Sequence, residues 1–445
     1  MSETLQKGLY ELCGERIAAD AAFGAERAEN GVTDALFDEY RLFQLQRTLR
    51  LVSEKSPFYR RLFEARGVNP VDVRSLRDLA RLPFTTPDEL SGGGYSFLCS
   101  SQSSVEKPVT FFSSGSTGMK KRIFFSGADI EKILAFLPRG MNTVVDRDEG
   151  RVQVFLQNTN GRGIGGILAE SLRRFGFSAW VSDLADPVED IIEQTVKNRV
   201  NVWFGEAITI LRATRILEER MELKKLGMKC IFITMTNIPE SMTDYLQKAW
   251  GCRVSTHYGL TESGWGLAVD CDICPGYHYD ELDHIIEIVD PATGAPLPCG
   301  EPGEVVLTNI SRDCMPLIRY RTGDISTLTP SACGSYLELL GHIRRRREGA
   351  YTLGGRELYP ALFDQPLFAV PELLDYRLRA DGGRLCIDAE VLNTSGGVAE
   401  RIADAVMALP ELAGAARPRV TLLPCGALRQ YCFEKKRIAA DGDGG

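Results

Sequence analysis

The sequence of 445 residues has no long apolar run, no positive net charge and no low-complexity tract before residues 441–445. No stretch approaches the roughly 18 apolar residues of a membrane span, and Met1 to Gly14 carries charges without a continuous apolar run. We therefore expect neither a signal peptide nor a membrane anchor. The formal net charge of -8 argues against a general nucleic-acid binder, because neutralising phosphates requires a basic face. These absences predict a cytoplasmic protein that binds neither nucleic acid nor membrane.

A disulfide framework is not expected either. The 12 cysteines belong to a chain with no recognised export signal, and in a reducing compartment cysteines are thiols or metal ligands. We expect free thiols together with one metal site.

The pattern of apolar runs predicts an α/β protein. Between Val152 and Ile233 short apolar runs alternate with helical stretches, as in parallel strands that are covered by helices. Leucines in the segment from Leu36 to Phe63 have helical spacing. From Ile285 onward, short strands separated by Pro/Gly turns indicate a β-rich subdomain.

Four consecutive arginines, Arg344 to Arg347, lie at the expected domain boundary. They are either a solvated charged face or a hinge before a C-terminal unit of about 100 residues. We predict a large layered α/β domain with a β-rich subdomain over residues 1–343, and a small α+β domain over residues 344–445.

The segment from Ser113 to Arg122 places hydroxyls, glycines and cations between two strand-like runs, Val109 to Phe112 and Ile123 to Phe125. Glycines let backbone N–H groups approach an anion, while hydroxyls and cations add donors and positive charge. The spacing is not that of a Walker loop, because Lys120 stands where the second glycine is required. Taken alone, the segment is either a polyphosphate-binding loop or a flexible Ser/Gly turn with a solvated basic end.

Further motifs follow this segment in a fixed order. They are Tyr258 to Glu262 (YGLTE), Gly300 to Glu304 (GEPGE), Tyr320 to Asp324 (YRTGD) and Gly355 to Pro360 (GRELYP). Two more precede it, Ser56 to Tyr59 (SPFY) and Leu82 to Thr86 (LPFTT). With these motifs the chain resembles the adenylate-forming superfamily of acyl-CoA synthetases, and within it the phenylacetate-CoA ligase-like branch.

The resemblance implies an ATP-dependent acid–thiol ligase. A carboxylate, from an aryl or small organic acid, would attack the α-phosphate of ATP and form an acyl-adenylate, and coenzyme A would then take the acyl group. It also implies Mg²⁺ as a cofactor, a mobile C-terminal lid and possible homodimers. Two alternatives keep the fold: a nucleotide-binding pseudoenzyme or partner protein, and an adenylyltransferase that acts on a cofactor without forming a thioester.

The resemblance also assigns roles to residues. The β- and γ-phosphates would be held by Lys121 and by the loop residues Ser113, Ser114, Gly115, Ser116, Thr117 and Gly118. Thr261 would contact the α-phosphate and Glu262 would bind Mg²⁺. Asp324 and Arg346 would bind the ribose, with Tyr258 and Gly259 beside the adenine or the acid. The less specific expectations for the acid pocket are Trp203, Phe204, Ile233 to Asn237 and Trp265, each of which could equally belong to the core.

Two positions depart from the family pattern. The loop Thr234 to Asn237 lacks the usual acidic residue. Near the C-terminus, where the family has a lysine that bridges carboxylate and phosphate, the matching spacing holds Glu434. A carboxylate there would repel the substrate's charge, and a shift of one residue would let Lys435 serve instead. Lys436 is the further alternative.

Cysteine and histidine form a second constellation. Cys271 and Cys274 form a Cys-x-x-Cys pair, His278 follows, and Cys333 comes after the YRTGD motif. Soft thiolates and an imidazole favour a tetrahedral Zn²⁺ site, which we expect to be structural because the ATP chemistry already employs Mg²⁺. His257 is an alternative ligand or a pocket residue. Otherwise these cysteines are ordinary thiols.

Overall fold

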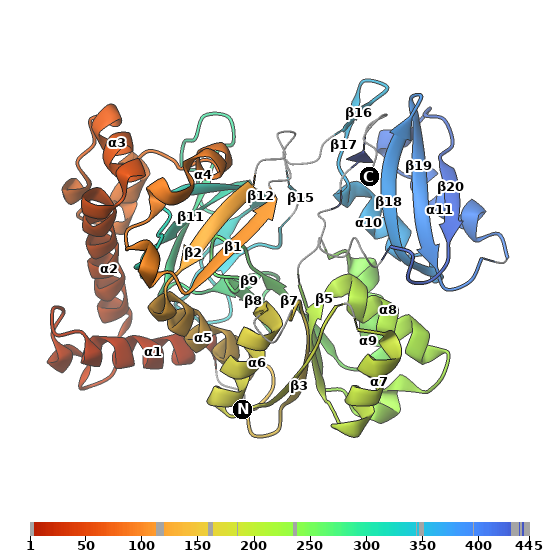
Figure 1. Ribbon diagram of the computed structural model, residues 1–445, viewed down its shortest axis with the longest axis horizontal. Coiled ribbons are helices and arrows are strands. Elements are labelled where there is room, and N and C mark those ends of the chain that lie inside the picture. Colours follow the sequence, from red (N-terminus) through yellow and green to blue (C-terminus); the bar gives the residue numbers. More distant parts are fainter. Residues whose placement is uncertain are drawn as a thin grey trace. The chain divides into compact units, whose positions relative to one another are not determined.

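The computed structural model describes residues 4–112, 120–158, 163–184, 186–234, 238–343, 345–346, 351–394, 396–428, 436 and 438–439. The chain forms two compact units. Figure 1 labels their helices and strands. Unit 1 comprises Met1–Asp146 and His257–Arg344, and unit 2 comprises Arg147–Thr256 and Arg345–Gly445. Within the described ranges, no helix is both long and apolar enough to cross a membrane.

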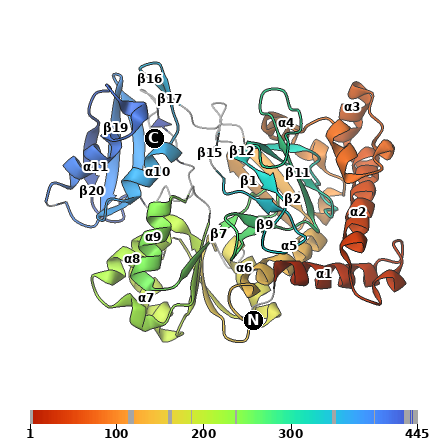
Figure 2. The ribbon, with the colours of Figure 1, turned by 180° about the vertical axis from the view of Figure 1, so that it is seen from behind.

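Unit 1 begins with helices. They are α1 (Leu5–Ala19), α2 (Asp34–Lys55), α3 (Pro57–Arg66), α4 (Pro87–Gly93) and, later, α5 (Gly127–Asn142). The expected helical segment from Leu36 to Phe63 is present as two helices, α2 and α3, which lie side by side (Figures 1 and 2). The break falls at Ser56, whose side chain accepts a hydrogen bond from the N–H of Tyr59, while Pro57 opens α3.

The strands of unit 1 are antiparallel. β1 (Lys107–Phe112) pairs with β2 (Lys120–Phe125), so the predicted strands on either side of the Ser/Gly segment are confirmed. β10 (His284–Val289), β11 (Gly303–Asn309) and β12 (Tyr320–Ser326) pair in that order. The end of β7 (Arg253–Tyr258) pairs with β8 (Ala268–Asp270), followed by β9 (Tyr277–Tyr279), β14 (Leu339–Leu340) and β13 (Leu328–Thr329). The short strands expected from Ile285 onward are therefore confirmed.

Unit 2 contains a parallel sheet in the order β4-β3-β5-β6-β7. Its further strands are β3 (Arg151–Phe155), β4 (Ser178–Ser182), β5 (Val202–Glu206) and β6 (Cys230–Thr234). They alternate with α6 (Ile164–Phe175), α7 (Val188–Lys197), α8 (Ala207–Glu218) and α9 (Glu240–Trp250). β5 and β6 are buried throughout, as expected for strands covered on both faces. The predicted α/β class is confirmed.

The C-terminal part of unit 2 is α+β. Its sheet has the order β20-β19-β18-β21, with α11 packed against β20 (Figure 2). The elements are β15 (Arg345–Arg346), β16 (Tyr351–Leu353), β17 (Arg356–Leu358), α10 (Ala361–Phe368), β18 (Leu373–Asp381), β19 (Arg384–Val391), α11 (Val398–Met407), β20 (Arg419–Leu423) and β21 (Ile438–Ala439).

One hydrophobic core joins the two parts of unit 2. Trp203 and Trp250 from the parallel-sheet part belong to the same buried cluster as Phe363 and Tyr376 from the C-terminal part. One boundary of the compact units lies between Arg344 and Arg345, beside the arginine run. Apart from this boundary, the two compact units do not coincide with the two predicted domains, 1–343 and 344–445. The division into those two domains stays a prediction.

Candidate functional site

Lys121, Glu262 and Tyr320 converge in unit 1. The Nζ of Lys121, in β2, donates a hydrogen bond of 3.0 Å to the phenolic oxygen of Tyr320, at the start of β12. That phenol donates a hydrogen bond of 2.7 Å to Oε1 of Glu262, and Lys121 Nζ lies 3.7 Å from the same oxygen. All three side chains are buried. The structure thus brings together the two residues expected to contact phosphate and magnesium, and adds a tyrosine that sequence reasoning left without a role.

The turn after β7 carries Glu262 and is tightly packed. A Cβ added at Gly259 would lie 1.8 Å from the carbonyl oxygen of Trp265, so only glycine fits at this position. Trp265 itself has φ of +70°, a left-handed conformation that is uncommon for a large side chain. Its N–H donates to the carbonyl of Leu260 at 2.8 Å, which closes the turn on which Thr261 and Glu262 lie.

Buried ionisable residues pack near this turn. His284 lies 3.1 Å from the carbonyl oxygen of Ser263 through its Nε2. Burial, and then the nearby Arg312, lowers the pKa of His284 to about 4, so the imidazole is neutral at pH 7. Burial likewise lowers the pKa of Arg312 to about 10, and its guanidinium lies 4.9 Å from the centre of the Phe125 ring. The Phe125 ring in turn lies 4.7 Å from that of Trp265.

Asp324 lies in β12, where its carboxylate accepts a hydrogen bond of 2.7 Å from the phenol of Tyr258. The backbone N–H of Asp324 donates to Oγ1 of Thr322 at 3.1 Å, and the residue is 1% exposed. Tyr258 therefore holds the expected ribose ligand through its hydroxyl. The stacking of its ring on adenine stays a prediction.

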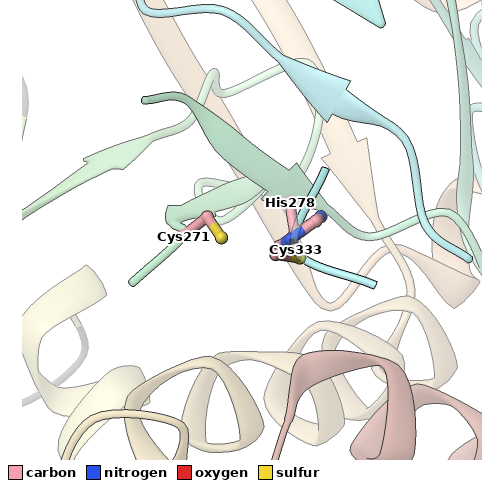
Figure 3. Close-up of side chains that lie close together, drawn as sticks. All are labelled: Cys271, His278 and Cys333. Atoms are coloured by element: carbon pink, nitrogen blue, oxygen red, sulfur yellow. Dashed lines mark hydrogen bonds between the residues drawn. The ribbon is translucent and has the colours of Figure 1, made fainter. Parts of the chain in front are cut away.

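Three of the four expected zinc ligands also lie together (Figure 3). One ligand atom each of Cys271, His278 and Cys333 falls within 4.8 Å of the others, and the Nε2 of His278 is 3.3 Å from the Sγ of Cys333. Cys274 is not a member of this group of three, but its backbone N–H and that of Ile273 each lie 3.4 Å from the Sγ of Cys271.

The donor set fits a metal that prefers nitrogen and sulfur. The Nδ1 of His278 lies 3.2 Å from the carbonyl oxygen of Glu338, an acceptor that places the proton on Nδ1 and leaves the lone pair of Nε2 for a ligand bond. Burial lowers the pKa of His278, which keeps the ring neutral at pH 7. N–H groups directed at the Cys271 sulfur stabilise a thiolate. His257 is not part of the group.

Several expected residues fall elsewhere. Trp203 is fully buried against Phe155 and Trp250, so it belongs to the core. Phe204 is buried beside Phe232. The predictions for Ser113 to Gly118, for residues 235–237, and for Glu434 and Lys435 lie outside the described residues, as does the side chain of Arg346.

Lys436 has structural partners within unit 2. Its Nζ pairs with the carboxylate of Asp375 at 2.7 Å, donates to the carbonyl of Tyr376 at 3.2 Å, and lies 3.5 Å from the centre of the Tyr376 ring. Of the two alternatives for the C-terminal lysine, Lys436 is thus already engaged by β18.

Comparison with known proteins gives a consistent set of relatives, although no protein-family model matches the chain. Phenylacetate-coenzyme A ligase of Thermus thermophilus is 28% identical over 352 residues, which cover 76% of this chain and 77% of that protein. The ligase of the same name from Escherichia coli is 25% identical over 348 residues, covering 76% and 78%.

Solved structures show the same fold. The structure of 2-hydroxyisobutyryl-CoA ligase in the postadenylation state, in complex with R3-HIB-AMP, aligns with a TM-score of 0.76 over 92% of this chain and 91% of that chain, at 20% identity. An open conformation of the same ligase, in complex with 2-HIB-AMP and CoA, aligns with a TM-score of 0.62 at 21% identity. At this identity, the likeness establishes the architecture.

Proposed function

We propose that this chain, which belongs to the phenylacetate-CoA ligase-like branch of the adenylate-forming superfamily, is an ATP-dependent, AMP-forming acid–CoA ligase. The observation that carries the proposal is the convergence of Lys121 and Glu262 on one phenol, from motifs far apart in the sequence. A second convergence, Tyr258 on Asp324, lies between two other motifs of the branch.

The reaction has two steps. An oxygen of the acid's carboxylate attacks the α-phosphorus of ATP, the bond to the β-phosphate oxygen breaks, and pyrophosphate leaves. The thiolate of coenzyme A then attacks the acyl carbon, and AMP leaves with the electron pair of the acyl–oxygen bond. Neither step needs a nucleophile from the protein, so catalysis depends on positioning and on charge stabilisation.

Each residue of the site has a place in this scheme. Lys121 supplies positive charge to the β- and γ-phosphates, and Thr261 donates to the α-phosphate. Asp324 accepts hydrogen bonds from the ribose hydroxyls. Glu262 would hold Mg²⁺, for which a buried carboxylate oxygen is a suitable hard ligand, and the ion would neutralise phosphate charge. Lys435 would bridge the acid and the α-phosphate.

Zn²⁺ would be held by Cys271, Cys274, His278 and Cys333. Three thiolates and one imidazole form a closed tetrahedral set, which indicates a structural ion. Metal analysis of the purified protein should find close to one equivalent of zinc, and Cys271→Ser should lower it. The exposed Cys299 provides the matched control, because Cys299→Ser removes a thiol outside the cluster. Unchanged zinc in Cys271→Ser would refute the site.

Pyrophosphate release and exchange test the activity. Purified protein, ATP and Mg²⁺ are mixed with a panel of aryl and short-chain acids, with and without coenzyme A. Glu262→Gln should abolish exchange while Glu301→Gln, at an exposed acid, should not. If the wild type binds ATP but neither releases nor exchanges pyrophosphate with any acid of the panel, the result would favour the pseudoenzyme. A stable AMP ester as product would indicate an adenylyltransferase. The acid's identity, cytoplasmic location and homodimer formation stay predictions.

A further inference from the structure

We propose that Tyr320 is a positioning residue of the nucleotide site, and that the SPFY and LPFTT motifs hold it in place. Its phenol keeps Lys121 and Glu262 apart and orients the Glu262 carboxylate for Mg²⁺. The inference rests on the proposed function, because it takes Lys121 as a phosphate ligand and Glu262 as the magnesium ligand.

The phenol lies between a cation and an anion. It accepts a hydrogen bond from Lys121 Nζ at 3.0 Å and donates one to Glu262 Oε1 at 2.7 Å, while the ammonium and that oxygen stay 3.7 Å apart. The two groups already form an ion pair at this distance, and without the phenol between them they would close to direct hydrogen-bond contact, because attraction between charges is strong where water is excluded. Direct contact would occupy the donor and the acceptor that the phosphates and Mg²⁺ require.

The same phenol leaves one oxygen of Glu262 available. Oε1 is engaged by Tyr320, whereas Oε2 accepts no hydrogen bond from any side chain or N–H that the structure describes. A carboxylate fixed through one oxygen presents the other in a defined direction, as second-shell hydrogen bonds do for metal ligands generally. Tyr320 thus orients the carboxylate that would hold Mg²⁺.

A residue of the LPFTT motif, Thr85, holds the backbone on both sides of Tyr320. Thr85 forms a parallel bridge beside Tyr320: its N–H donates to the carbonyl of Arg319 at 3.0 Å, and its own carbonyl accepts from the N–H of Arg321 at 2.9 Å. The hydroxyl of Thr85 also donates to the carbonyl of Ile318 at 2.8 Å. Backbone and side chain of one threonine therefore fix the residues on both sides of the phenol.

The SPFY motif completes this contact. The phenolic oxygen of Tyr59 accepts a hydrogen bond of 2.8 Å from the N–H of Ile318 and lies 3.0 Å from Oγ1 of Thr85. Tyr59 and Thr85 are fully buried. Buried polar groups that satisfy one another in this way rigidify the backbone they hold.

Arg319, the residue directly before β12, is held in place by several contacts. It has φ of +47°, which is rare for a residue other than glycine and persists only where the surroundings enforce it. Its guanidinium makes two hydrogen bonds of 2.9 Å to Glu287, donates to the carbonyls of Ala80 and Leu82, and lies 4.0 Å from the centre of the Phe84 ring. The left-handed turn at Arg319 sets the direction in which Tyr320 begins the strand.

Tyr320→Phe tests the inference. ATP affinity is measured by calorimetry with Mg²⁺ and with EDTA, and the Mg²⁺ concentration for half-maximal pyrophosphate exchange is measured in parallel. We expect Tyr320→Phe to lose roughly tenfold or more of the affinity that Mg²⁺ adds, because hydrogen bonds to charged groups are the strong ones. The matched control is Tyr279→Phe, which removes a fully buried phenol that donates to another carboxylate, that of Glu338, at 3.0 Å.

Thr85→Val provides a second test, at a residue to which the proposed reaction assigns no contact with the nucleotide. It should shift the Mg²⁺ dependence in the same direction as Tyr320→Phe, and Thr85→Ser should restore it, because serine keeps the hydroxyl. If Thr85 contributed only to the stability of the fold, Thr85→Val would have a lower melting temperature but an unchanged Mg²⁺ dependence, which would contradict the inference.

The outcomes separate the two proposals. Suppose that the wild type binds ATP more tightly with Mg²⁺ than with EDTA. If Mg²⁺ raises the ATP affinity of Tyr320→Phe and Thr85→Val by the same factor, this inference alone is overturned. A wild type that binds no nucleotide overturns the proposed function and this inference with it.

Discussion

Glu390→Gln should destabilise unit 2 strongly, because the Glu390 carboxylate is the centre of a buried polar network. Arg212 of α8 donates to it twice, through Nε at 3.0 Å and Nη2 at 3.2 Å. The backbone N–H groups of Gly426 and Leu428 donate to the same carboxylate at 2.9 and 2.8 Å. The Glu390 side chain is fully buried and that of Arg212 is 3% exposed.

The size of the loss in unfolding free energy follows from the negative charge and the second acceptor oxygen that glutamine lacks. Its side-chain oxygen still accepts, but its NH₂ group faces donors on the other side, and the buried Arg212 loses the counter-charge to which it is hydrogen-bonded. Removing one partner of a buried ion pair typically costs about 3–5 kcal/mol. We expect Glu390→Gln to lower the free energy of unfolding by that amount.

Urea unfolding followed by tryptophan fluorescence is suited to this measurement. Trp180, Trp203 and Trp250 lie in unit 2, so the signal reports mainly on that unit. The control is Asp388→Asn, which breaks the ion pair with Arg379 on the same sheet. The side chains of that pair are 20% and 50% exposed, so its loss should cost only about 0–1 kcal/mol.

A cost for Glu390→Gln no larger than that for Asp388→Asn would refute the reasoning. The result also bears on catalysis, because Gly426 and Leu428 directly precede the segment that contains Lys435. If Glu390 anchors the base of that segment, then a Glu390→Gln protein that is still folded should show slower pyrophosphate exchange.

Three further changes give separate outcomes. Gly259→Ala should abolish ATP binding in calorimetry, because the added Cβ would lie 1.8 Å from a carbonyl oxygen, whereas Gly92→Ala meets nothing within 4 Å and should bind normally; wild-type affinity in both would show that the turn adapts. A strong chelator should lower the melting temperature of the wild type and of Cys299→Ser but not that of Cys333→Ser, and equal responses would contradict a structural zinc. His284, whose pKa is lowered to about 4 by burial and then by a nearby arginine, contributes stability that is complete above pH 6.5 and is lost as the pH falls through 4. The wild type should therefore lose unfolding free energy faster than His284→Asn over that range, and parallel pH profiles would contradict this.

Local patterns in the sequence were sufficient for most elements of the parallel sheet. The alternation predicted between Val152 and Ile233 is present as the strands β3, β4, β5 and β6, with the helices α6, α7 and α8 between them. These elements are defined by periodicity and by nearby end signals, such as the left-handed Gly176 after α6. The break between α2 and α3 was missed, although Ser56 and Pro57 form a recognisable start of a helix.

The site was predictable only as far as its motifs could be recognised. Lys121, Glu262 and Asp324 came from resemblance. The structure gives each of them a tyrosine partner, Tyr320 for the first two and Tyr258 for Asp324, and no local rule predicts these contacts. The hydrogen bonds that fix the start of β12 join residues 233 and 259 positions apart, between Thr85 and Ile318 and between Tyr59 and Ile318. A periodicity spans tens of residues at most and carries no information about such pairs. The SPFY and LPFTT motifs could therefore be recognised in the sequence as typical of the branch, but their connection to the strand that carries Tyr320 and Asp324 required the tertiary structure.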